Sequence, residues 1–308
     1  RYGLEGLGED SAFADIHMSG LELRLLAIHQ ENHPQLFSGL QAYAQLHGRF
    51  LDNALAAFER ELQFFVSYAL YMQTLREAGY PFAYPSFCAE ARLDIVEGYD
   101  LSLAQLAHVE ERTVVPNDVL LQPGERSLIL TGPNQGGKTT FARMLGQIVC
   151  LASLGLPVPC RGAMLCLPGA VYTHFAVEED STTGDGRLRE ELARLAPILK
   201  GAPERSWVLL NELFSSTTQH DARIMGAQVL RALSEKACMC LYVTHIVALA
   251  GEPGAVSLVA GIADGKARTF RMERSPADGL VYAGPLLDQY GLRSKAIQEV
   301  LHASIPSV

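Results

Sequence analysis

A glycine-rich stretch at residues 128–140, LILTGPNQGGKTT, has residue types and spacing suited to binding phosphate. It fits the pattern G-x-x-x-x-G-K-[ST], with Gly132, Gly137, Lys138 and Thr139 at the defined positions. Glycines let backbone N–H groups surround a phosphate, and the N-terminus of a following helix adds partial positive charge. The lysine brings a charge to the β- and γ-phosphates, and the threonine hydroxyl can bind Mg²⁺. We therefore predict a nucleoside triphosphate site here, rather than a strand-to-helix turn that binds nothing.

A second polar group follows the apolar run at residues 207–210. An apolar strand ending in carboxylates is the usual partner of a phosphate loop, since the first acid holds the Mg²⁺ water shell and the second polarises the attacking water. Asn211 occupies the first position, keeps an oxygen acceptor and lacks the charge, so we expect weaker Mg²⁺ binding. Glu212 occupies the second, so hydrolysis remains possible. The alternative is a surface-facing pair at a strand end.

Three further polar features lie downstream. His245 ends another apolar run, and we expect it to face a γ-phosphate, although a lone histidine is often structural. Asp221 starts a helix and, taken alone, is an N-terminal helix charge. Residues 181–192 form a polar loop that opens a helix. Taken alone, that loop is a helix cap followed by a solvated face of Arg187, Arg189, Glu190 and Glu191.

Strands and helices alternate along the middle of the chain, which predicts an α/β sheet with helices on its faces. The predicted elements are a strand (128–131), a helix (138–152), a strand pair (163–175), a helix (187–200), a strand (207–212), a helix (219–236) and a strand (239–244). Before them we predict a linker or small sheet entrance (82–112), a strand (113–115) and a turn (116–118). After them we predict a hairpin of 267–274 with 280–283 and a short helix at 294–302.

The first 80 residues have a helical pattern. We predict helices at 21–30 and 36–47, divided by His33-Pro34, and a longer helix at about 50–78. Apolar residues of the long helix recur with a period of 3.5, typical of a coiled-coil seam. This predicts a helical arm over 1–81, distinct from a domain over 82–308. One side of an ordinary helical bundle is the alternative.

The composition indicates which classes of protein are less compatible with this chain. The net charge of −9 does not suggest a nucleic-acid surface spread over the chain, although a local basic patch remains possible. Six cysteines show neither CxxC pairs nor metal-ligand spacing, so we expect reduced thiols in a cytoplasmic protein. The uncharged stretch at 144–160 contains two glycines and two prolines and is too short to span a membrane.

These segments together resemble the MutS family. TGPNQGGKTT is similar to its phosphate loop, TGPN-x-GGKS/T, and YVTHIVAL at 242–249 resembles its A-T-H switch. Residues 171–186 resemble the segment leading to its signature helix, and 207–222 resemble its Walker B strand and following loop. Residues 115–121 and 288–291 are similar to its flanking segments. The resemblance covers about 82–301, and 20–81 more weakly resemble its helical lever.

The resemblance implies a P-loop NTPase of ABC/MutS type that binds ATP and Mg²⁺ and dimerises to form two composite sites. DNA binding follows from the family only. Glu212 would orient water, His245 would sense the γ-phosphate, and Thr139 would bind Mg²⁺, with Asn211 acting through water. Residues expected at the dimer interface are Gly184, Asp185, Gly186 and Asp221. Residues expected to bind ATP are Gly132, Pro133, Asn134, Gln135, Gly136, Gly137, Lys138, Thr139 and Thr140.

Several residues depart from the family pattern. Its Walker B aspartate is Asn211, its signature serine aligns with Gly186, and an aromatic that often stacks on adenine is replaced by Val114. Nothing resembles the mismatch-reading domain. Three hypotheses remain: a MutS-like ATPase coupled to DNA repair, a nucleotide-gated interaction module with little turnover, and an SMC-like or other ABC ATPase. The last lacks an LSGGQ-type signature.

Overall fold

The computed structural model describes residues 19–48, 52–175, 186–263 and 267–277 of the 308-residue chain. The chain divides into two compact units, Arg1–Leu70 and Tyr71–Val308. The last predicted helix, at 294–302, and the second hairpin strand, at 280–283, lie outside the described residues.

The first unit is helical, as the sequence predicted. Helix α1 (Gly20–Asn32) starts with a capping box, in which Ser19 and Glu22 each bond the backbone N–H of the other. Helix α2 (Pro34–His47) begins at the proline, whose missing N–H is not needed at a helix start. Helix α3 (Asn53–Glu77) confirms the long predicted helix. Its seam residues Leu55, Phe58, Leu62 and Phe65 are exposed in this structure.

The second unit contains a six-stranded sheet in the order β10-β9-β4-β8-β7-β6. The strands are β4 (Ser127–Thr131), β6 (Val171–His174), β7 (Trp207–Asn211), β8 (Met239–Val243), β9 (Ala255–Ala263) and β10 (Ala267–Arg274). All neighbouring pairs are parallel except β9 with β10. The parallel strands therefore end at one common edge, which suits a ligand site.

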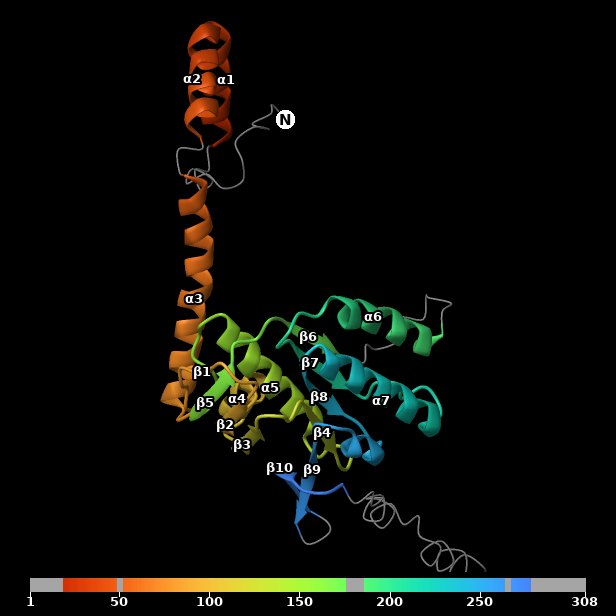
Figure 1. The fold of residues 1–308 in the computed structure, drawn as a ribbon. Coiled ribbons are helices and arrows are strands. Elements are labelled where there is room, and N and C mark those ends of the chain that lie inside the picture. Colours follow the sequence, from red (N-terminus) through yellow and green to blue (C-terminus); the bar gives the residue numbers. More distant parts are fainter. Residues whose placement is uncertain (1–18, 49–51, 176–185, 264–266, 278–308) are drawn as a thin grey trace, which may run out of the picture. The chain divides into compact units, whose positions relative to one another are not determined.

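Helices cover both faces of this sheet (Figure 1). Helix α5 (Lys138–Ser153) packs on one face, against Leu128 and Leu130, and belongs to the larger apolar core. Ile129 points to the opposite face, which is covered by α6 (Arg187–Gly201) and α7 (Gln219–Glu235). This alternation of side chains along β4 explains why the strand is apolar throughout: both of its faces are buried.

A smaller four-stranded sheet has the order β1-β5-β2-β3. Its strands are β1 (Ser86–Cys88), β2 (Leu93–Gly98), β3 (Asn117–Leu121) and β5 (Gly162–Cys166). The buried residues Leu93, Val119 and Leu165 share one core with α5, so this sheet supports the helix that follows the glycine-rich loop. Helix α4 (Leu101–Val109) lies between β2 and β3 in the chain.

The structure corrects three sequence predictions and adds one strand. The expected pair at 163–175 is not a pair, because β5 and β6 belong to different sheets. The turn expected at 116–118 is the start of β3, and 113–115 is not a strand. The segment at 82–112, predicted as a linker or a small sheet entrance, holds β1 and β2 of the smaller sheet and helix α4, which agrees with the second alternative. Strand β10 confirms the strand predicted at 267–274 and pairs with β9, an alternating strand that the sequence analysis missed.

The cysteines and the apolar helices of the described residues can also be compared with the predictions. Cys238 and Cys240 are buried, and all six cysteines are free thiols. In the part of the chain that the structure describes, no helix is both long and apolar enough to cross a membrane. The short 3₁₀ helix η1 (Val247–Gly251) connects β8 to β9.

Candidate functional site

The glycine-rich loop joins the end of β4 to the start of α5, as predicted. Gly132 has φ +128°, and a Cβ there would lie 2.8 Å from the Cβ of Ala260 on β9. Gly137, with φ +90°, caps the start of α5. Both positions need glycine, one for space and conformation and the other for conformation. The backbone thus curls tightly at the N-terminus of a sixteen-residue helix.

Lys138 lies inside this curl, with only 5% of its surface exposed. Its Nζ donates hydrogen bonds to the carbonyl oxygens of Gly132 (2.9 Å) and Pro133 (3.0 Å). Burial lowers the pKa of Lys138, Glu212 opposes the shift, and Arg268 adds to it. The ammonium group is therefore held by the loop itself, close to the carboxylate from the end of β7. A phosphate within the curl would meet this cation directly.

The polar residues after β7 and β8 reach the same edge of the sheet. Val243 is in register with Leu130 on one side and with Asn211 on the other. Backbone N–H groups just beyond the strands continue the pairing: Thr244 donates to Leu130 O at 3.0 Å, and Glu212 donates to Val243 O at 2.9 Å. The predicted residues 211, 212 and 245 are thereby placed beside the loop that holds Lys138.

Glu212 and His245 face one another across this edge. Oε1 of Glu212 lies 3.5 Å from Nε2 of His245, and both side chains remain partly exposed. Glu212 has a left-handed φ of +53°. A carboxylate and an imidazole in reach of each other and of solvent can together orient a water molecule and exchange a proton with it.

Asn211 is the last residue of β7, and its Oδ1 is buried with no hydrogen-bond partner among the described residues. An unpartnered buried oxygen next to a candidate phosphate site fits a ligand that donates hydrogen bonds, such as the water shell of Mg²⁺. Thr139, in the first turn of α5, is exposed. The side chains therefore fit the expected metal, although the described residues contain no cluster of three or more His, Cys, Asp or Glu able to bind a metal ion.

The residues predicted for a dimer interface are only partly described. Gly186 is the exposed N-cap of α6, whereas Gly184 and Asp185 lie outside the described residues. Asp221 is exposed in the first turn of α7, where its N–H donates to Thr218 Oγ1 at 3.2 Å and its Oδ2 accepts from that hydroxyl at 2.8 Å. Asp221 thus contributes to a helix cap, which was the simpler of its two interpretations.

Strand β10 brings residues to the loop that the sequence analysis did not identify. Arg268 donates to Gln135 Oε1 at 3.3 Å. Phe270 sits at a β-bulge with φ +58°, and its ring lies 3.4 Å from the position of a Cβ on Gly137. Asn117 fixes the bulge, since it accepts from Met272 N at 2.7 Å and donates to Phe270 O at 3.1 Å. No local sequence signal marks such a bulge.

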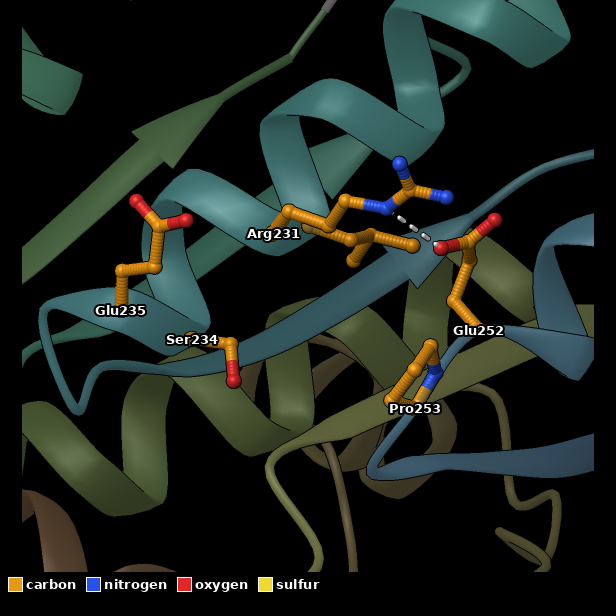
Figure 2. Close-up of a pocket in the computed structure, with 6 residues that line it drawn as sticks. Arg231, Ser234, Glu235, Glu252 and Pro253 are labelled. Atoms are coloured by element: carbon orange, nitrogen blue, oxygen red, sulfur yellow. Dashed lines mark hydrogen bonds and ion pairs between the residues drawn. The ribbon is translucent and has the colours of Figure 1, made fainter.

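A surface pocket lies elsewhere, beside the last turns of α7 (Figure 2). Arg231 and Glu252 form an ion pair of 3.0 Å across it. The other lining residues are Leu230, Ser234, Glu235 and Pro253. None of them belongs to the loop or the strand ends, so the candidate site is defined by the sheet edge and not by this pocket.

The fold is α/β, with a glycine-rich loop and polar strand ends at one edge of a mainly parallel sheet. The family described as MutS domain V matches residues 128–294, more than half of the chain. The chain belongs to the MutS family.

Individual relatives agree with this assignment. The chain is 34% identical over 170 residues to the DNA mismatch repair protein msh3 of Botryotinia fuckeliana, a match covering 54% of this chain and 15% of the relative. It is 38% identical over 138 residues to the DNA mismatch repair protein MutS of Thermus thermophilus, covering 44% and 17%. The chain thus matches less than a fifth of the length of these relatives.

Proposed function

We propose that this chain is an ATP-binding and ATP-hydrolysing MutS-like protein, in which ATP binding closes a dimer and hydrolysis reopens it. One observation carries the proposal: Lys138, enclosed by the glycine-rich loop, shares an edge of the sheet with the Glu212–His245 pair. A triphosphate in the loop would extend its terminal phosphate toward that pair, because the loop and both strand ends lie at the same edge.

Each residue then has a separate task. Loop N–H groups and the Lys138 ammonium bind the phosphates, and Glu212 orients the attacking water. His245 contacts the γ-phosphate and relays its presence to Glu212. Thr139 would bind Mg²⁺ directly and Asn211 through a water molecule. When bound, Mg²⁺ neutralises charge on the phosphates.

Dimerisation would complete the site. The segment that includes Gly184, Asp185 and Gly186 precedes α6 and would approach the nucleotide of a second copy, with Asp221 nearby. Backbone N–H groups would make this contact, since no serine is present at 186.

A second candidate function is a nucleotide-gated interaction module with little turnover. Asn211 favours it, because an amide oxygen attracts the Mg²⁺ water shell less strongly than a carboxylate. The two candidates predict the same nucleotide binding and different turnover.

Steady-state ATP hydrolysis with Mg²⁺, measured against protein concentration, separates them. Composite sites predict activity per protomer that rises with concentration and disappears in Glu212→Gln. Measurable ATP binding without turnover would support the interaction module. In both cases Lys138→Ala should lose ATP binding, whereas Lys200→Ala, an exposed lysine in the last turn of α6, should retain it. Unchanged binding in Lys138→Ala would refute both.

We also propose DNA as a partner, because the relatives are named DNA mismatch repair proteins. If the chain binds DNA through the phosphate backbone, affinity should fall steeply as salt increases. A mobility-shift titration at several salt concentrations tests this, and the absence of salt-sensitive binding would remove DNA as a partner of this chain.

A further inference from the structure

A buried carboxylate on α6 bonds the turn that carries Glu212. Glu191 is 8% exposed, and its Oε2 accepts a hydrogen bond of 2.9 Å from the backbone N–H of Phe214. The sequence predicted Glu191 on a solvated face together with Arg189 and Glu190. Those two are exposed, and Glu191 is not. Burying a carboxylate costs free energy unless the carboxylate is hydrogen bonded. The position of Glu191 against this turn therefore needs an explanation.

The turn from 212 to 214 is strained. Glu212 has φ +53° and Phe214 has φ +63°, the left-handed region that residues with a Cβ disfavour. Such a turn persists only where surrounding groups hold it. Two hydrogen bonds besides that of Glu191 do so: Glu212 N–H donates to Val243 O at 2.9 Å, and Tyr242 Oη donates to Leu213 O at 3.4 Å.

The three bonds come from two elements. Those of Val243 and Tyr242 come from β8, in the centre of the sheet. That of Glu191 comes from α6, a helix at the surface whose first turn follows the segment proposed to approach a second copy. Tyr242 is also electrostatically coupled to Glu191: burial chiefly raises the pKa of Tyr242, and the Glu191 carboxylate raises it further. The carboxylate thus connects the outer helix to the centre of the sheet.

From this geometry we infer that Glu191 is a positioning residue for Glu212, which it serves by fixing the 212–214 turn to α6. The inference rests on the proposed function, in which Glu212 orients water and α6 adjoins the dimer contact. In this role Glu191 acts on the backbone of the turn, through its bond to Phe214 N–H. It sets the direction of the Glu212 side chain through the backbone of the turn. The ability of Glu212 to orient water therefore depends on the position of α6.

Two substitutions separate this role from simple packing. Glu191→Gln keeps an oxygen that can accept from Phe214 N–H, whereas Glu191→Met keeps the length and removes the acceptor. We expect Glu191→Met to increase amide hydrogen exchange at Phe214 about tenfold and to lower kcat for ATP by about the same factor. KM for ATP should change less than about twofold, because the phosphate loop is untouched. Glu191→Gln should keep both the exchange rate at Phe214 and kcat close to those of the unsubstituted chain. Glu191→Asp, with a shortened side chain, provides a third variant should Glu191→Met fail to fold.

The outcomes distinguish this inference from the proposed function. If the unsubstituted chain has no ATPase activity, the proposed hydrolysis fails, and exchange at Phe214 still decides whether Glu191 holds the turn. Equal amide exchange at Phe214 in Glu191→Met, Glu191→Gln and Glu191→Asp would overturn the inference. Faster exchange with unchanged kcat, in a chain that does hydrolyse ATP, would also overturn it.

Discussion

His245 and Glu212 follow strands that are direct neighbours, β8 and β7, and their side chains approach to 3.5 Å between Nε2 and Oε1. Neighbouring parallel strands end together, so a spacing of 33 residues in the chain becomes contact in space. The contact makes each side chain a partner of the other and leaves both partly open to solvent.

This contact predicts the effect of His245→Gln. The glutamine keeps a polar group of similar reach and loses the imidazole, so Glu212 loses its partner and the contact proposed with a γ-phosphate is lost as well. We expect kcat for ATP hydrolysis to fall about 100-fold with ATP affinity nearly unchanged. His220→Gln is the matched control, since His220 is exposed in the first turn of α7. A His245→Gln variant with full kcat would reassign the histidine to a structural role.

Gly132 allows a test of the loop independent of catalysis. Gly132→Ala places a Cβ 2.8 Å from that of Ala260 at φ +128°, so we expect a loss of about 2 kcal/mol in the free energy of unfolding. Adding Ala260→Gly should recover part of the loss, because it removes the shortest contact but leaves the backbone N of residue 260 at 3.0 Å and the backbone strain at residue 132. Gly162→Ala, which meets open space on β5, should cost less than about 0.5 kcal/mol. Denaturant unfolding measures all three, and additive effects of the first two substitutions would contradict the predicted collision.

The core of the fold and site was predictable from local chemistry. The strand, loop and helix at 128–153 were recognisable because glycine, lysine and threonine at fixed spacing leave few alternatives. The pair of Asn211 and Glu212 was recognisable because an apolar strand precedes it. What escaped prediction depends on partners distant in sequence. The small sheet joins strands from residues 86 to 166, and β10 turns back on β9. Glu191 stands in a run of charges, and only the packing of α6 against the 212–214 turn distinguishes it from Glu190.

Because His174 is buried, we expect the free energy of unfolding to depend on pH. His174 is 2% exposed at the end of β6; burial lowers its pKa below the ordinary value of 6.5, Arg194 lowers it further, and Glu191 opposes the shift. As pH falls through about 6.5, the unfolded chain binds a proton at this position before the folded chain does. Stability is therefore present above that pH and is lost below it, by up to about 1.4 kcal/mol per pH unit until the folded histidine also protonates.

The measurement is the free energy of unfolding from pH 8 to about pH 5. His174→Gln removes the titrating group, so its curve should be flatter than that of the unsubstituted chain, and the difference between the two isolates His174 from the other groups. His220→Gln should follow the unsubstituted curve, because His220 is exposed. Parallel curves for the unsubstituted chain and His174→Gln would show that His174 does not contribute.

Asn211 supports the last prediction, made with Asn211→Asp. The Asn211 Oδ1 is buried without a hydrogen-bond partner among the residues described here, at the edge that holds Lys138 and Glu212. A carboxylate there is costly alone, because it is partly desolvated and adds a second negative charge beside Glu212. With Mg²⁺ and nucleotide bound, the same charge attracts the ion's water shell. The variant should therefore melt at a lower temperature than the unsubstituted chain without ligand and gain more from Mg²⁺ with a non-hydrolysable ATP analogue.

The ATPase activity of Asn211→Asp should also reach half its maximum at a Mg²⁺ concentration about tenfold lower. Asn32→Asp adds the same charge at the exposed end of α1 and should change neither the gain from Mg²⁺ with the analogue nor the Mg²⁺ concentration for half-maximal activity. An unaltered Mg²⁺ requirement in Asn211→Asp would show that the water shell of the ion is held by other residues, and that the asparagine does not limit turnover.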